Sequence, residues 1–177
     1  RKFLLLLALI GAGWAFAADD FLPPEQAFRF EVRALDERSV EVAFEVEDGY
    51  YLYGEQFRFK ADEGAVALGA PQRPPGVIKY DETFQKDVET YRGRIAIRLR
   101  VERAPAAFVL TVVSQGCADA GLCYPPMESR AELRLAGFGG DGSVRVLPAA
   151  GGVVPSAAEP ARTPAAAPAN SGDAQVD

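Results

Sequence analysis

The chain has 177 residues, a net charge of −6, two cysteines and no histidine. Phosphate binding requires clusters of Lys and Arg, so the acidic balance argues against a nucleic-acid-binding protein. Without histidine there is no Ser-His-Asp or Cys-His catalysis, and two cysteines alone leave no convincing zinc or other metal site. The length allows one domain of ordinary size with tails.

The N-terminal segment has the features of a secretory signal peptide. Arg1-Lys2 supplies the positive charge, residues 3–10 are apolar, and residues 15–17 (Ala-Phe-Ala) resemble a cleavage site. The apolar run is shorter than the roughly 20 residues of a membrane span, although an uncleaved anchor is the alternative. We therefore predict a signal peptide over residues 1–17 and export to an oxidising compartment, where disulfides persist.

Short alternating segments begin at residue 28. Hydrophobic residues alternate with charged ones with a period of two, which is typical of half-buried antiparallel strands. The alternating segments are 28–32, 40–46, 57–60, 94–101 and 130–135, the last of which we take as the final strand. Residues 94–101 should carry a basic outer face, because arginines alternate with aliphatic residues there.

Other segments complete a β-rich pattern. Residues 47–49 and 62–64 have turn composition, and residues 71–76 form a proline-rich connection. Residues 108–113 are nearly all apolar, so we expect a central strand covered on both faces. About seven short strands without an amphipathic helix predict an all-β sandwich over residues 18–147.

The composition changes from Pro148 onward. Residues 155–168 are rich in Pro and Ala and contain no large apolar side chain. Such a segment cannot bury a core, so we predict a disordered linker over residues 148–177. The alternative is the dangling tail of an independent protein.

Both cysteines lie in residues 115–126. Five residues lie between Cys117 and Cys123, and Gly116 and Gly121 can take positive φ angles, so the loop can bring the sulfurs together. A disulfide in so short a loop restrains the unfolded chain by only about 2.4 kcal/mol, which suits exchange with a partner better than cross-linking. A purely structural bridge, common in exported domains, is the alternative.

The segment Gly-Cys-Ala-Asp-Ala-Gly-Leu-Cys-Tyr-Pro-Pro (residues 116–126) closely resembles the active-site segment of the DsbD family, in the N-terminal periplasmic domain of the thiol:disulfide interchange protein. Residues 48–53 and the Tyr91-Arg92 pair also resemble that family, and the resemblance extends from about residue 23 to about residue 135. It implies an immunoglobulin-like antiparallel sandwich with a redox loop and a cap loop. It also implies protein-disulfide reductase activity by a redox-active cysteine pair without another cofactor.

The resemblance implies roles for the two cysteines and for the cap loop. Cys123 would exchange with the partner and Cys117 would resolve the mixed disulfide, although the residues alone do not order the two. Phe84 would be the cap aromatic that covers the sulfurs, or else an ordinary loop aromatic on the core. Thr83 is an extra residue relative to the family pattern, and Gln85-Lys86 replaces an aromatic-glycine pair.

Further side chains are candidates for active-site support. Tyr51 and Tyr53 share one face of a strand, where the pattern alone favours packing and the resemblance favours proximity to the cysteines. Asp81 and Glu82 belong to the cap loop, or are solvated turn residues. Asp119 lies inside the cysteine loop, where a carboxylate would raise the thiol pKa. We therefore expect a domain that reacts slowly until a partner docks.

The resemblance implies a module on the periplasmic side of the bacterial inner membrane. It would accept electrons from a membrane or thioredoxin-like donor domain and reduce disulfide isomerases and cytochrome c maturation thioredoxins. In the family, a membrane domain and a thioredoxin-like domain follow this position, so we expect the chain to be the N-terminal part of a longer protein. The alternative is an immunoglobulin-like binding or adhesion domain with a structural disulfide, whose reduction potential would lie below about −300 mV.

Overall fold

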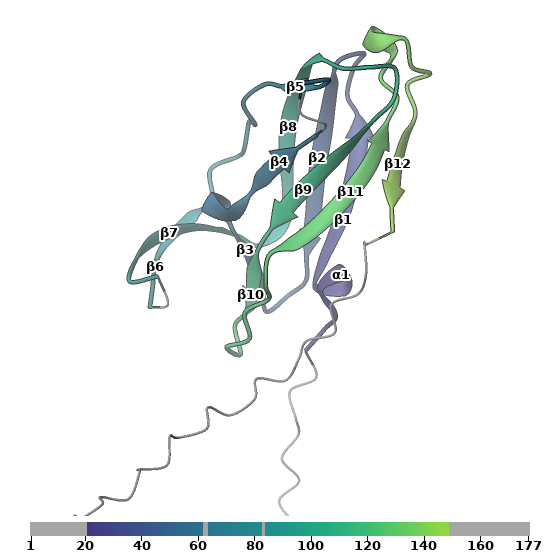
Figure 1. Ribbon diagram of the computed structural model, residues 1–177. Coiled ribbons are helices and arrows are strands. Elements are labelled where there is room, and N and C mark those ends of the chain that lie inside the picture. Colours follow the sequence, from purple (N-terminus) through teal and green to yellow (C-terminus); the bar gives the residue numbers. More distant parts are fainter. Residues whose placement is uncertain (1–20, 62–63, 83, 149–177) are drawn as a thin grey trace, which may run out of the picture.

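The computed structural model describes residues 21–61, 64–82 and 84–148. Apart from one short helix and two 3₁₀ turns, Gly54–Gln56 and Ala136–Phe138, the regular structure described consists of antiparallel strands (Figure 1). The elements in chain order are α1 (Pro24–Ala27), β1 (Phe28–Ala34), β2 (Ser39–Val46), β3 (Tyr50–Tyr53), β4 (Arg58–Lys60), β5 (Ala67–Leu68), β6 (Val77–Asp81), β7 (Lys86–Tyr91), β8 (Gly93–Arg103), β9 (Phe108–Ser114), β10 (Gly116–Ala118), β11 (Met127–Leu133) and β12 (Val144–Leu147).

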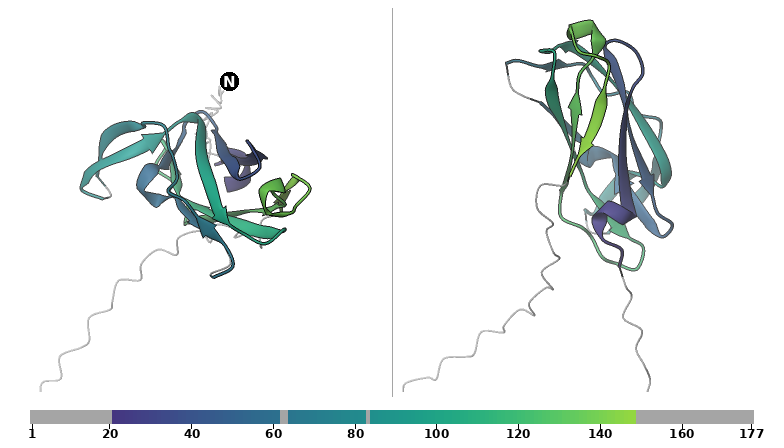
Figure 2. Two further views of the ribbon diagram at one scale, coloured as in Figure 1. Left: turned by 90° about the horizontal axis from the view of Figure 1, so that it is seen from above. Right: turned by 90° about the vertical axis from the view of Figure 1, so that its right-hand side faces the viewer.

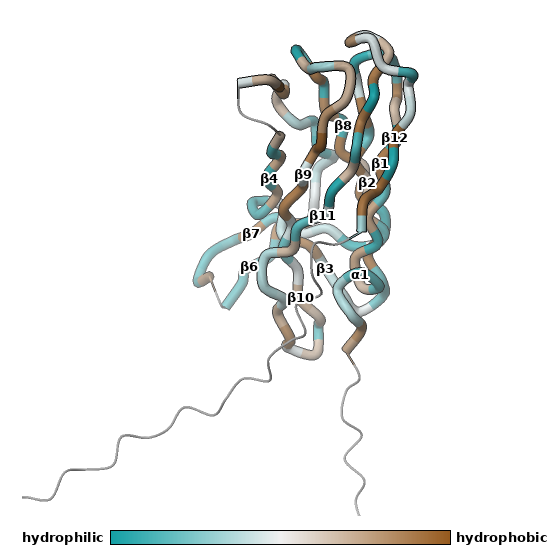
Figure 3. Tube along the Cα trace, turned by 45° about the vertical axis from the view of Figure 1, so that its right-hand side comes forward, coloured by the Kyte–Doolittle hydropathy of each residue, from teal (hydrophilic) through white to brown (hydrophobic). Residues whose placement is uncertain are grey.

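Two four-stranded sheets form the body of the molecule. Their strand orders are β1-β2-β8-β5 and β12-β11-β9-β4, and they enclose the main core between them (Figures 1 and 2). The alternation of β8 buries Ile95, Ile97 and Leu99 on one face. The apolar stretch of β9 runs through the middle of the fold in Figure 3. Burial of these aliphatic side chains is the main favourable contribution to folding.

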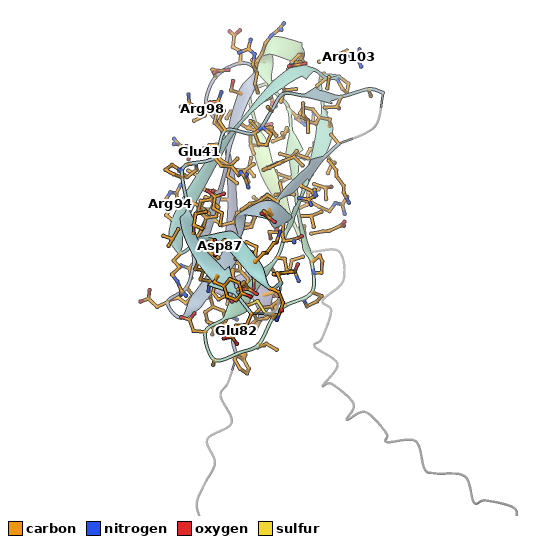
Figure 4. All side chains as sticks on the ribbon, turned by 90° about the vertical axis from the view of Figure 1, so that its left-hand side faces the viewer. Glu41, Glu82, Asp87, Arg94, Arg98 and Arg103 are labelled. Atoms are coloured by element: carbon orange, nitrogen blue, oxygen red, sulfur yellow. A yellow bond between two sulfur atoms is a disulfide. The ribbon has the colours of Figure 1, made fainter. Side chains whose placement is uncertain are left out.

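The outer face of the first sheet is charged. The arginines of β8 alternate with its core residues and are exposed, as predicted. Arg94 lies near Glu31, Glu41 and Glu45 of the neighbouring strands, at 3.1, 3.6 and 2.5 Å. Figure 4 shows Glu41, Arg94 and Arg98 on the same side of the molecule. Because Arg94 is about half-exposed, each of these ion pairs contributes little to stability.

A third four-stranded sheet, with the order β10-β3-β7-β6, extends one end of the sandwich. Only Gln115 separates β9 from β10, and only Arg92 separates β7 from β8, so strands of the sandwich continue into this sheet. The β6–β7 hairpin projects from the body in Figures 1 and 2. The third sheet therefore consists of residues 50–53, 77–81, 86–91 and 116–118, and the strands that continue from the sandwich hold it in place.

The predicted all-β sandwich and its alternating strands are confirmed, with four corrections. Residues 108–113 are central but not covered on both faces, because every second residue of β9 is only half-buried. The predicted final strand is followed by β12, which pairs with β11. The β6–β7 hairpin was not predicted, because residues 77–91 lack a clear alternation of apolar and charged residues. The helix α1 was not predicted either, because its four residues are too few to show a helical period.

The predictions for the two ends of the chain fall largely outside the described residues. The predicted signal peptide, 1–17, is not described, and of the predicted linker, 148–177, only Pro148 is. Within the described part of the chain, no helix is long and apolar enough to cross a membrane.

Candidate active site

Cys117 and Cys123 form a disulfide at the free end of the third sheet. Their Cα atoms are 4.0 Å apart, and the two residues face each other across a tight hairpin. Cys117 lies in β10 opposite Tyr51 of β3 and is 1% exposed, whereas Cys123 on the returning arm is exposed. A thiol of another protein can therefore reach Cys123 more easily than Cys117.

A short turn closes the hairpin. The amide of Ala118 donates to the carbonyl of Leu122 at 2.7 Å, and the amide of Gly121 donates to the carbonyl of Ala118 at 3.0 Å. Gly121 has φ 99°, as expected for the left-handed last position of such a loop. The sequence Ala-Asp-Ala-Gly between the cysteines therefore accounts for the turn locally.

The expected conformation of Gly116 is wrong, because its φ is not positive. A Cβ atom at this position would lie 2.4 Å from the carbonyl oxygen of Tyr51 and 2.7 Å from the ring of Phe28. Glycine is therefore required here because β10 passes close to neighbouring atoms, and not because of its backbone freedom.

Two tyrosines of β3 face the buried cysteine. Tyr51 and Tyr53 form a small buried cluster with Val88 and Cys117, as their shared face predicted, while Tyr50 joins the main core on the opposite face. The Tyr53 hydroxyl lies 3.5 Å from the Cys117 sulfur and 3.3 Å from the Tyr51 hydroxyl. Because the sulfur in a disulfide carries no hydrogen, it can only accept at this contact.

Asp81 at the end of β6 is buried behind these tyrosines. It is 6% exposed and accepts hydrogen bonds from the Tyr53 hydroxyl at 2.8 Å and from the Phe84 amide at 3.0 Å. The alternative of a solvated turn residue is therefore wrong for Asp81. Burial, followed by the hydrogen bonds with Tyr51 and Asp81, raises the pKa of Tyr53 far above its usual value. Tyr53 consequently remains a phenol at neutral pH and can donate.

Phe84 packs on Tyr53 from the loop that closes the β6–β7 hairpin. The two rings meet edge to face with centroids 5.2 Å apart, and Phe84 remains 39% exposed. The ring therefore covers the tyrosine whose hydroxyl touches Cys117. Gln85 takes a left-handed conformation, with φ 56°, at the position where the family pattern has an aromatic residue before glycine. Glu82 is exposed and lies at the same end as the disulfide in Figure 4.

Asp119 forms an ion pair with Arg92, which the sequence analysis did not predict. The Arg92 guanidinium donates to both carboxylate oxygens at 2.6 and 2.9 Å. This hydrogen-bonded pair holds the pKa of Asp119 below its usual value. The expected effect of Asp119 on the thiols assumed an uncompensated carboxylate, whereas the positive charge of Arg92 lies beside it here and opposes that effect.

Arg92 and Lys79 are the site residues that the sequence did not identify. Arg92 lies 5.2 Å from the ring centroid of Tyr51, and the Lys79 ammonium lies 3.7 Å from it. Both distances fit cation–π contacts. The resemblance of the Tyr91-Arg92 pair to the family could have identified Arg92 as a site residue. Nothing in the sequence pattern around Lys79 indicated a role for it. The described residues contain no group of three or more His, Cys, Asp or Glu side chains that could hold a metal ion.

Comparison with known proteins identifies the family. Residues 18–135 match the family described as thiol:disulfide interchange protein DsbD, N-terminal. The chain belongs to this family. It is 47% identical over 156 residues to the DsbD protein of Ralstonia nicotianae, which covers 88% of this chain and 24% of that protein. It is 40% identical over 106 residues to DsbD of Escherichia coli K12, which covers 60% of this chain and 18% of that protein. The chain thus spans about a quarter or less of these relatives.

Solved structures of DsbD N-terminal domains share the fold. The crystal structure of the Neisseria meningitidis domain in the reduced form has a TM-score of 0.61 at 30% identity, and the match covers 72% of this chain and 95% of that chain. A complex between the DsbD and PilB N-terminal domains of the same species has a TM-score of 0.57 at 30% identity, and the match covers 76% of this chain and 97% of that chain. The immunoglobulin-like sandwich expected for a DsbD N-terminal domain is confirmed.

Proposed function

We propose that this DsbD N-terminal domain is a thiol-disulfide exchange module that receives two electrons at the cysteine pair and passes them to disulfides of partner proteins. The observation that carries the proposal is the asymmetry of the pair, with Cys123 exposed and Cys117 buried in a short hairpin at one end of the sandwich. Exchange requires one sulfur that a partner can reach and a second that resolves the intermediate.

In the first half of the cycle, a donor thiolate attacks the Cys123 sulfur. A donor–Cys123 disulfide forms, the Cys117–Cys123 bond breaks, and Cys117 leaves as a thiolate that takes up a proton. The second donor thiol then attacks the mixed disulfide as a thiolate, which oxidises the donor and leaves Cys123 reduced. The domain ends with two thiols and the donor with one disulfide.

In the second half, the Cys123 thiolate attacks a partner disulfide and forms a mixed disulfide while one partner thiolate leaves. The Cys117 thiolate then attacks the Cys123 sulfur, restores the internal disulfide and releases the second partner thiolate. Both released thiolates are protonated, so the partner is reduced by two electrons and the domain is oxidised by two. The exposure of Cys123 and the burial of Cys117 support this assignment of their roles.

Supporting residues would act on the buried sulfur. Tyr53, kept protonated, can turn its hydroxyl from Asp81 towards the Cys117 thiolate when that thiolate forms. Phe84 would act as the cap, because its ring covers Tyr53 and because its backbone is held by Asp81. Glu82, exposed on the same loop, would contact a docking partner.

The finer partner and location assignments are part of the proposal. The donor would be a thioredoxin-like or membrane domain downstream in the same protein. The acceptors would be periplasmic thioredoxin-like proteins, including disulfide isomerases and cytochrome c maturation thioredoxins. The neisserial complex of DsbD and PilB N-terminal domains supports partner docking by a domain of this fold. The predicted signal peptide supports a periplasmic position.

A redox titration tests the proposal. The purified chain is equilibrated in glutathione or dithiothreitol buffers, and free thiols are trapped with an alkylating reagent. We expect reversible conversion of one disulfide to two thiols in the folded state, at a potential above about −300 mV. A disulfide that stays oxidised under all native conditions would instead support a binding domain with a structural bridge.

A further inference from the structure

Arg92 contacts both the cysteine hairpin, at Asp119, and the neighbouring strand β3, at Tyr50 and Tyr51. Its guanidinium binds both carboxylate oxygens of Asp119, donates to the carbonyl of Tyr50 at 3.2 Å, and lies over the ring of Tyr51. Because Arg92 is the single residue between β7 and β8, its backbone is fixed by a long strand of the sandwich. The side chain therefore reaches the hairpin from a rigid support.

Asp119 is held on its backbone as well as on its side chain. Its amide donates to the carbonyl of Gly49 at 2.7 Å, in the turn between β2 and β3. Asp119 begins the turn that connects the two arms of the hairpin, between Cys117 and Cys123. A contact that fixes this turn against β3 therefore restricts the motion of the loop that joins the two cysteines.

We propose that the Arg92–Asp119 ion pair is a latch that keeps the hairpin closed when the cysteines are reduced, and that it thereby favours re-formation of the disulfide. Arg92 and Asp119 are thus positioning residues for the exchange reaction, and the inference rests on the proposed function. The disulfide joins the two arms of the hairpin and the ion pair holds its turn against the sandwich, so both restrict the same loop and each lowers the entropy cost of forming the other. This coupling is reciprocal: if the disulfide stabilises the ion pair, the ion pair stabilises the disulfide by the same free energy.

The exposure of the pair limits the size of the effect. The side chains are 49% and 51% exposed, and half-exposed ion pairs are weak, although a bidentate geometry strengthens them. We therefore expect loss of the latch to lower the equilibrium constant for disulfide formation about two- to fivefold. At 29.6 mV per tenfold change, this makes the reduction potential about 9–21 mV less negative.

The test measures that constant in glutathione buffers for the full chain and for Arg92→Gln, Asp119→Asn and the double variant. In each single variant the equilibrium constant for disulfide formation should fall two- to fivefold. In the double variant it should fall no further than in the more affected single variant, because the two residues act as one pair. The latch is also screened by salt, so raising the ionic strength should lower the wild-type constant more than that of Arg92→Gln.

A matched control separates the latch from general effects of losing an arginine. Arg33 pairs with Glu41 at 2.9 Å near the C-terminal end of β1. Arg33→Gln should leave the equilibrium constant for disulfide formation unchanged. Equal constants in wild type and Arg92→Gln, or additive losses in the double variant, would overturn the latch while leaving the exchange function intact. A lower melting temperature with an unchanged constant would likewise assign Arg92 a merely structural role. A wild-type disulfide that never reduces would overturn both proposals.

Discussion

The hydroxyl oxygen of Tyr53 lies 3.5 Å from the sulfur of Cys117, although the two residues are 64 positions apart in the chain. The same hydroxyl donates to the buried Asp81 carboxylate. Tyr53 thus connects the less accessible sulfur of the pair to a buried carboxylate on the β6–β7 hairpin. This contact links the chemistry of the disulfide to the packing of the cap loop, and the first prediction tests it.

Replacing Tyr53 by Phe should destabilise the fold, because it removes the hydroxyl that donates to buried Asp81. We expect a loss of about 1–3 kcal/mol in the free energy of unfolding, measured in urea. Tyr91→Phe is the control, since that hydroxyl donates at 2.9 Å to a backbone carbonyl, that of Pro74, and not to a buried carboxylate. If both variants lost the same free energy of unfolding, the hydrogen bond to Asp81 would contribute no more to stability than the bond to the Pro74 carbonyl.

Cys117→Ala should leave Cys123 able to hold a partner in a stable mixed disulfide. Cys123 is exposed, and without Cys117 no internal thiol resolves the intermediate. The measurement is non-reducing electrophoresis after mixing with an oxidised thioredoxin-like protein. Cys123→Ala is the matched variant and should trap little, because Cys117 is 1% exposed. The role assignment is wrong if only Cys123→Ala accumulates the complex.

Phe84→Ala should speed reduction of the disulfide by small thiols while changing partner-driven reduction less, because a docking partner displaces the ring in any case. With 39% of the residue exposed, the cost in stability should stay below the roughly 3–5 kcal/mol of a fully buried Phe truncation. Stopped-flow reduction by dithiothreitol and by a thioredoxin-like protein measures both rates. Identical dithiothreitol rates in wild type and variant would show that Phe84 is not a cap.

Gly116→Ala should be destabilising by about 1–3 kcal/mol or more, because the added methyl group overlaps the Tyr51 carbonyl and the Phe28 ring. Gly69→Ala is the control, since a Cβ there would meet its nearest neighbours only at 3.4 Å. Urea unfolding of both variants measures the difference. If the two substitutions cost the same, β10 can move away from β3 more easily than the structure indicates.

Several features were predictable from the sequence because their causes are local. The alternation in β1, β2 and β8 specifies which side chains each strand buries, whatever the strand pairs with. The period of two also placed Tyr51 and Tyr53 on the face opposite Tyr50, as the structure confirms. The two cysteines could pair only with each other, and Gly121 supplied the turn between them.

Other features depended on which segments the fold brings side by side. The bond from Tyr53 to Asp81, the pairing of Arg92 with Asp119 and the close approach at Gly116 all join segments that are distant in the chain. Local patterns specify the face of a strand but not its neighbour or its register. The sequence by itself therefore determined the strands with a clear alternation, the cysteine pair and the family, whereas only the tertiary structure decided that Asp81 is buried, that Asp119 is paired with Arg92 and that Cys123 is the accessible sulfur.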